Sequence, residues 1–266
     1  MATKKNDEVV PQGSNLPAVS YDYGTMAGGG FEGATHEDFV MPFLNLLQPM
    51  SQEVSNNPNA RPGMLMNSVT KQLYDGKTGL IFVPCARQHV FVEWKPRDQG
   101  GGIVARHEPT SDVVIEAKAG AKSFGQYTTP AGNDLIETYY LVGYLLDSVD
   151  DEEPSGAIVV PFWSTKIRVY KRVMQMLNMF KGRPPLFANK LRVTTSQEKN
   201  QSGTFYNYNV MPVNGGVGES LIPPKHPLLA FGQQLNKQVH SGERRMADES
   251  VNESGNGNST DGDMPF

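Results

Sequence analysis

The stretch that most constrains the fold is Thr138-Tyr139-Tyr140-Leu141-Val142-Gly143-Tyr144-Leu145-Leu146. Aromatic and β-branched residues favour strands because they pack well on a pleated, half-buried surface. An acidic loop at 150–154 separates this stretch from a second apolar run at 157–162, which predicts another strand. Ser164 or Thr165 can then cap a helix over 166–180. Residues 189–195 and 204–213 predict a closing hairpin through the polar turn at 196–203.

The sequence before this stretch also predicts mainly strands. Candidates lie at 64–70, 80–86 and 88–94, and 103–107 can return from a glycine-rich tip at 98–102. Apolar residues between Asp38 and Leu47 predict a short amphipathic helix despite Pro42. The pattern over 108–134 is ambiguous because glycines and a proline interrupt it.

Strands, one helix and a closing pair of strands follow the element order of an oligonucleotide-binding (OB) barrel, although other small β-barrels share this order. We therefore expect a mainly β protein built as an elaborated OB-fold-like barrel with one central helix. Residues 1–35 are polar and glycine-rich, which predicts a disordered N-terminal segment. The expected organisation is that segment, an OB-like domain over 36–235 with insertions, and a disordered acidic tail over 236–266.

Charge is strongly segregated along the chain, although the formal net charge is only −4. The tail from Ala247 contains five acidic residues and neither Lys nor Arg. Within residues 161–200, Glu198 is the only acid, and it stands against nine cations: Lys166, Arg168, Lys171, Arg172, Lys181, Arg183, Lys190, Arg192 and Lys199. A basic body with acidic ends predicts a polyanionic ligand and a tail that competes for the same surface.

The chain ends in Asp261-Gly262-Asp263-Met264-Pro265-Phe266, an apolar hook after two carboxylates. Such a peptide suits a partner pocket that takes the Phe266 ring and a basic rim that takes the carboxylates. It resembles the acidic C-terminal tip of bacterial and bacteriophage single-stranded DNA-binding proteins, with Gly262 interrupting the acidic run. The resemblance implies that Asp261, Asp263, Met264, Pro265 and Phe266 bind replication partners such as a polymerase, helicase, primase or nuclease.

Aromatic and basic residues alternate along several predicted elements, as expected of a sequence-tolerant binder of single strands. The candidate DNA-binding residues are Phe91, Trp94, Lys95, Arg97, Trp163, Lys166, Arg168, Lys171, Arg172, Lys190, Arg192, Tyr206 and Tyr208. Lys190 and Arg192 alternate with apolar neighbours and are expected to share one strand face. Many of the aromatic residues can instead be core, Phe91 and Phe162 among them.

The function expected from these features is non-catalytic binding and protection of single-stranded DNA during replication, recombination and repair. Neither a cofactor nor a metal is expected, a homo-oligomer is possible, and the expected location is the cytoplasm, the host's if a phage encodes the chain. No run approaches the roughly 20 apolar residues of a membrane span, so no membrane association is expected. The N-terminus lacks a secretory signal, and the single cysteine, Cys85, fits a reducing compartment.

Three alternatives remain open. Asp98 or Asp112 with Glu116 and Lys118 matches the short acid, Glu-x-Lys scheme of metal-dependent nucleases. Cys85, His89 and His107 could supply three zinc ligands, although no second pair completes a tetrahedral site. The third alternative is an adaptor that does not bind DNA and acts through its tail alone.

Overall fold

The computed structural model describes residues 40–242 except positions 122, 124, 201 and 202, together with residues 29, 30 and 32. At Arg97 it describes the backbone only. The chain divides into two units, Met1–Thr35 and His36–Phe266. In the first unit, the backbone N–H of Gly30 donates to the Glu32 carboxylate over 2.8 Å. Nearly all of the described residues belong to the second unit, and most of both predicted tails lies outside them.

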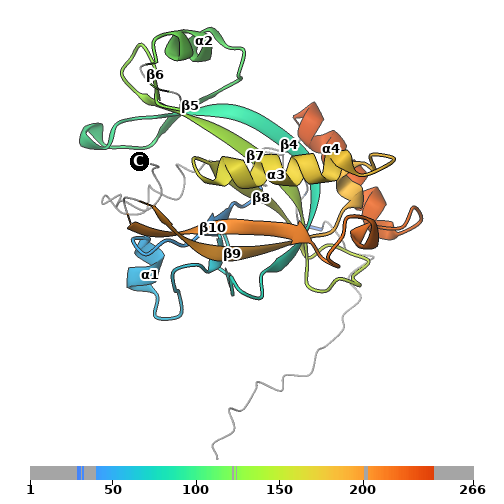
Figure 1. Ribbon diagram of the computed structural model, residues 1–266. Helices are drawn as coiled ribbons and strands as arrows, with labels where there is room; N and C mark the ends of the chain where they lie inside the picture. Colours follow the sequence, from blue (N-terminus) through green and yellow to red (C-terminus); the bar gives the residue numbers. More distant parts are fainter. Residues whose placement is uncertain are drawn as a thin grey trace, which may run out of the picture. The chain divides into compact units, whose positions relative to one another are not determined.

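A long antiparallel pair of strands, β4 (Leu80–Trp94) and β7 (Asp134–Leu146), forms the centre of a seven-stranded sheet. At one end β4 pairs with β9 (Leu191–Asn200), β9 with β10 (Gly203–Pro212), and β7 with β8 (Gly156–Trp163). At the other end, β5 (Ile103–His107) and β6 (Tyr127–Thr128) flank the β4–β7 pair, and we call this end of the sheet the arm. The pair therefore runs from the main body into the arm (Figure 1).

A bulge in β4 explains why the sequence indicates two strands where there is one. Pro84 pairs with Gly143 and Ala86 with Val142, so Cys85 is the extra residue. A proline is tolerated in a strand at such a bulge because the hydrogen-bond ladder is already interrupted. A Cβ atom on Gly143 would lie 2.1 Å from the Val83 carbonyl oxygen, so only glycine fits opposite the bulge.

A second, small sheet contains β1 (Leu44–Leu46), β2 (Leu65–Asn67) and β3 (Leu73–Tyr74). The segment that contains β1 lies between β8 and β10. On one side Val159 N donates to Pro42 O over 2.8 Å. On the other side the Gln48 side-chain amide mimics a neighbouring strand. Its Nε2 donates to Tyr206 O (3.0 Å), and its Oε1 accepts from Tyr206 N (2.9 Å). Among the described residues no pairing joins β8 to β10, so the strands form no closed barrel.

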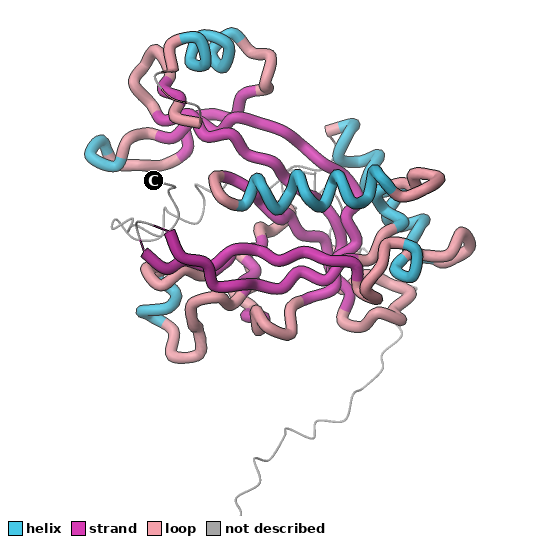
Figure 2. Tube along the Cα trace, in the orientation of Figure 1, coloured by secondary structure: helices cyan, strands magenta, loops and turns pink. Residues whose placement is uncertain are grey.

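The described residues contain four α-helices: α1 (Gln52–Asn56), α2 (Asp112–Ala119), α3 (Lys166–Met179) and α4 (Pro227–Ser241). The same residues also form short 3-10 helices: η2 (Arg97–Gln99), η3 (Leu186–Ala188) and η4 (Gly218–Ser220). Figure 2 shows the β9–β10 hairpin beside α3, and α2 in the arm. In this part of the chain every helix is too short or too polar to cross a membrane.

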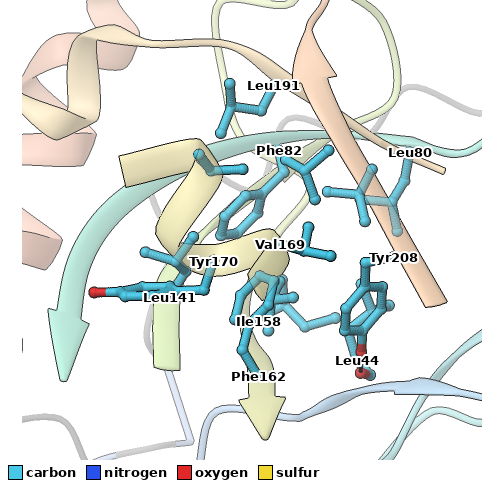
Figure 3. Close-up of a cluster of buried hydrophobic side chains, with 14 of the residues drawn as sticks. Leu44, Leu80, Phe82, Leu141, Ile158, Phe162, Val169, Tyr170, Leu191 and Tyr208 are labelled. Carbon is cyan, nitrogen blue, oxygen red and sulfur yellow. Dashed lines mark hydrogen bonds between the residues drawn. The ribbon is translucent and has the colours of Figure 1, made fainter. Parts of the chain in front are cut away.

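Each of the longer helices covers one apolar surface. Val169 and Tyr170 of α3 pack with Phe82, Phe162 and Tyr208 in the main core (Figure 3). The apolar side of α4, which includes Leu228 and Leu235, packs on the other side of the sheet against Tyr140 and Val142. In the arm, Val114 and Ala117 of α2 pack with Phe91, Tyr127 and Leu135.

The mainly β prediction is confirmed, as is the helix over 166–180. A hairpin follows it as predicted, but the turn expected at 196–203 was wrong, because residues 196–200 continue β9 and pair with β10. The prediction of a single helix was wrong, since α2 and α4 are also substantial, and the OB barrel is not confirmed. The helix expected over 38–47 was also wrong in its described part, because residues 44–46 form β1 and pair with β2. Helix α4 runs to Ser241, so the boundary expected at 235 falls inside it.

Candidate nucleic-acid interface

The two tryptophans of the chain lie on one face of the sheet. Trp94, at the end of β4, pairs with Asp134, and Trp163, at the end of β8, pairs with Thr138. Asp134 and Thr138 are four residues apart on β7, so their side chains lie on the same face of the sheet. Residues directly opposite each other on neighbouring strands also share a face, so Trp94 and Trp163 lie on that face too. Strand spacings of ~3.3 Å per residue and ~4.8 Å between strands place the two tryptophans roughly 16 Å apart. Both are half-buried, and we call this surface the tryptophan face.

A buried hydrogen-bond network fixes the arm next to Trp94. Glu93 is 7% exposed. It accepts from Asn133 Nδ2 (2.6 Å) and Thr129 Oγ1 (3.2 Å), and His107 Nε2 lies 2.7 Å from its other oxygen. Burial raises the pKa of Glu93, but the hydrogen bonds outweigh it and leave the pKa lowered, so the carboxylate is charged near neutral pH. Trp94 is therefore presented from a rigid strand end.

The turn from β8 into α3 places a cation against Trp163. Ser164 has a φ of 51°, a left-handed conformation that redirects the chain at this point. Lys166 follows, with its Nζ 3.9 Å from the Trp163 ring centroid and 5.7 Å from that of Tyr208. The first turn of α3 contains no acid, and cations there oppose the helix dipole. Lys166 itself is only 5% exposed, so the exposed cations of this helix begin at Arg168.

Three exposed cations continue along α3. Arg168, Lys171 and Arg172 have the i, i+3, i+4 spacing that places side chains on one side of a helix. We call them the α3 cations. Arg168 Nη2 lies 3.3 Å from Glu198 Oε2 on β9. Arg172 Nη2 donates to Asn209 Oδ1 on β10 over 3.3 Å.

A hollow of about 130 Å³ opens between α3 and the β9–β10 hairpin. Its lining consists of two α3 cations, the apolar Val169 of α3 and four hairpin residues: Arg168, Val169, Arg172, Ser196, Glu198, Tyr208 and Asn209. We call it the α3 hollow. It is the place where helix and hairpin together could hold an anionic group.

Two of the predicted stacking residues are core. Phe91 has no exposed surface, packs edge-on against Tyr127 and lies under the Lys118 ammonium, 4.3 Å from its ring centroid. Tyr208 is 2% exposed and donates its hydroxyl to Leu44 O over 2.9 Å. A base cannot stack on either ring, so these two assignments were wrong as stacking platforms.

Lys190 and Arg192 alternate with the core residues Leu191 and Val193, as expected for one strand face, but they do not form an exposed pair. Lys190 lies just before β9, is 8% exposed and donates its ammonium to Val149 O. Arg192 donates to Thr78 O over 3.3 Å. The extended chain from Lys190 to Glu198 spans about 26 Å, so both cations lie at the far end of β9 from the α3 hollow.

The remaining predicted residues fall into three groups. Lys95 is exposed beside Trp94 and belongs with the tryptophan face. Tyr206 is half-buried and its ring lies on Gly63, which leaves no room for a side chain there. The Arg97 side chain and the tip residues lie outside what the structure describes: Asp261, Asp263, Met264, Pro265 and Phe266.

The residues of the enzymatic alternatives are not gathered into sites. Asp112 and Glu116 are one helical turn apart on α2, whereas Lys118, two residues beyond Glu116, points to the other side and lies over Phe91. Across the described ranges, no three His, Cys, Asp or Glu side chains come together as a metal site. His89 and His107 each contact a different glutamate, Glu137 and Glu93 respectively.

A stacked cluster of buried and half-buried rings joins β4, β7 and α3, and no sequence motif indicated it. His89 stacks on Tyr139 (ring centroids 4.1 Å apart), which stacks on Tyr170 (4.5 Å). Both His89 and Tyr139 also contact Glu137 Oε1, at 3.0 and 2.9 Å. Burial lowers the pKa of His89 although Glu137 opposes this, and burial followed by Glu137 raises the pKa of Tyr139. Both groups are therefore neutral near pH 7 and join α3 to the sheet.

Glu198, Asn209 and Ser196 line the α3 hollow but are not among the residues predicted from the sequence. One signal was visible, since Glu198 is the only acid among the cations of residues 161–200. Its position against Arg168 follows only from the packing of α3 beside the hairpin.

The family model described as Pam3 phage gp34-like protein matches residues 11–245, and the chain belongs to this family. Its description agrees with the expectation of a bacteriophage-type protein and names no activity. No curated protein matches the chain, and no solved structure matches it.

Proposed function

We propose that this phage gp34-like protein binds and protects single-stranded DNA during replication or recombination, without catalysis. The observation that carries the proposal is the tryptophan face. Trp94 and Trp163 share one side of the sheet, and the Lys166 ammonium, at the start of α3, lies over the Trp163 ring.

This arrangement suits both chemical parts of a single strand. Exposed base faces stack on aromatic rings, and each stacked base contributes about 1–3 kcal/mol regardless of its identity. Phosphates are neutralised by Lys and Arg, which releases counterions and makes affinity depend on salt. Stacking residues with adjacent cations therefore favour a sequence-tolerant binder over one that reads bases.

The strand order supports an OB-derived fold, which we include in the proposal. An OB barrel has three strands, a helix and two closing strands, and binds oligonucleotides on strands 2 and 3 and on the loops 1–2 and 4–5. Strands β4, β7, β8, β9 and β10, with α3 after β8, follow this order. In that correspondence Trp163 lies on strand 3, and Trp94 adjoins the 1–2 loop.

The sequence supports a second part of the proposal, recruitment of replication proteins by the tip from Asp261 to Phe266. The ring of Phe266 would form the anchor, and the acids would meet a basic rim. The proposed site of action is the cytoplasm of the host cell, and the proposed activity requires no cofactor.

Intrinsic fluorescence tests the DNA-binding part directly, because the chain has only 2 tryptophans and both lie on the proposed face. Single-stranded oligonucleotides should quench this emission, with an affinity that falls linearly on a log–log plot against salt. Duplex of the same sequence should bind more weakly, and labelled single strands with Mg²⁺ should stay uncut. Equal affinity for duplex, or binding insensitive to salt, would overturn the proposal.

The recruitment part has a separate test. Phe266→Ala removes a ring but no charge, so it should abolish capture of replication proteins while leaving DNA affinity unchanged. Deletion of 261–266 should do the same, with DNA affinity equal or higher because a competing acidic segment is gone. Identical captured proteins from intact and deleted chains would contradict this part alone.

A further inference from the structure

We infer that the α3 hollow is a phosphate-binding subsite and that the Glu198 carboxylate occupies its cations when no nucleic acid is bound. The inference rests on the proposed function and adds to it a position for one backbone phosphate and a residue that competes with that phosphate. It starts from the composition of the hollow, whose two cations, Arg168 and Arg172, face a single acid.

The charges of the hollow are incompletely balanced. Arg168 contacts the Glu198 carboxylate, but Arg172 contacts Asn209 Oδ1, which is a neutral acceptor. Two guanidinium groups therefore share one carboxylate, and the hollow keeps a net positive charge. A guanidinium binds phosphate through two parallel hydrogen bonds, so two of them one helical turn apart suit a phosphate group. The volume of about 130 Å³ has room for several water molecules and so for a phosphate.

The resident ion pair is easily exchanged. Its N to O distance is 3.3 Å, longer than the ~2.7–2.9 Å of a strong charge-assisted hydrogen bond. The Arg168 side chain is 78% exposed, so solvent screens the pair. The other Glu198 oxygen accepts from Asn207 Nδ2 at 3.3 Å, which retains the side chain beside the hollow. A phosphate can therefore displace the carboxylate from Arg168 at little cost.

The consequence is that Glu198 weakens DNA binding. Glu198→Gln removes the charge and keeps a side chain that can accept from Asn207. Loss of a negative charge within a few ångströms of a phosphate should raise affinity about three- to tenfold at low salt. Glu152→Gln is the matched control because Glu152 is exposed in the loop between β7 and β8 and the charge change is the same. That control should change affinity less than about twofold, since separated surface charges are screened.

The test measures two ligands on the full chain. Binding of a single-stranded oligonucleotide is followed by fluorescence. Binding of inorganic phosphate is followed by NMR of the side-chain N–H groups of Arg168 and Arg172. We expect Glu198→Gln to bind both more tightly than wild type, and Glu198→Ala to change both affinities in the same direction. We expect Arg172→Ala to reduce phosphate binding.

The outcomes separate this inference from the proposed function. If Glu198→Gln and Glu152→Gln behave alike for both ligands while wild type binds single strands, the inference is overturned and the proposed function stands. If phosphate shifts the two arginine signals more strongly in Glu198→Gln but no variant binds single strands, the subsite stands and the proposed function fails.

Discussion

Replacing the α3 cations together, as Arg168→Ala, Lys171→Ala and Arg172→Ala, should remove up to three phosphate contacts. Each phosphate neutralised on a single strand contributes about 0.7 to the slope of log affinity against log salt. The slope should therefore flatten by up to about 2, and affinity at 0.1 M salt should fall by about 100-fold, with little loss near 1 M. Stability should hardly change, because the three side chains are exposed and the ion pair lost is a surface one, worth ~0–1 kcal/mol.

The assay is a salt series of oligonucleotide titrations, with a thermal melt of each variant. Its control is a second triple variant, Lys77→Ala, Lys225→Ala and Lys237→Ala, which removes the same charge from exposed positions on other elements. If the DNA runs along α3, the control variant should keep most of the salt slope of the wild-type protein. Equal slopes for the two triple variants would mean that the DNA does not run along α3, and the reasoning from the α3 cations would be refuted.

Four further predictions concern single side chains. Gln48→Ala removes both hydrogen bonds to Tyr206 and should lower the free energy of unfolding by about 1–3 kcal/mol in urea titrations; an unchanged midpoint would contradict the role of Gln48 beside β10. Trp94→Ala should weaken single-strand binding by about 1–3 kcal/mol without shifting the melting temperature. Tyr206→Ala should instead lower that temperature, since its ring packs on Gly63. Burial raises the pKa of Cys85 to about 12, so its thiol should resist alkylation at pH 8 until the protein unfolds.

Local patterns predicted the second half of the body well. Strand β8, helix α3 and the β9–β10 hairpin follow one another through short connections, and each has its own strong period or turn signal. The first half was predicted less well because its elements depend on distant partners. Residues 44–46 carry an apolar pattern that suits a helix, yet they form a strand because β2 pairs with them and β8 and β10 lie on either side.

Some features of the candidate site could also be predicted from the sequence, and others could not. The segregation of charge, the basic composition of residues 161–200 and the presence of two tryptophans are properties of composition, so they can be read without a structure. The sequence alone could not decide which rings are core. Phe91 and Trp94 lie three residues apart on one strand, and the odd spacing puts them on opposite faces.

Which residues lie together depends on strand pairing and helix packing. Strand register placed Trp94 and Trp163 on one face although they are far apart in the sequence. Packing of α3 beside the hairpin placed Arg168 against Glu198, while Lys190, although it belongs to the same basic segment, is directed to Val149 at the other end of β9. Within one strand, side chains alternate between the two faces, so the local sequence shows which residues share a face. Which other residues lie against that face depends on how the strands pair and where the helices pack.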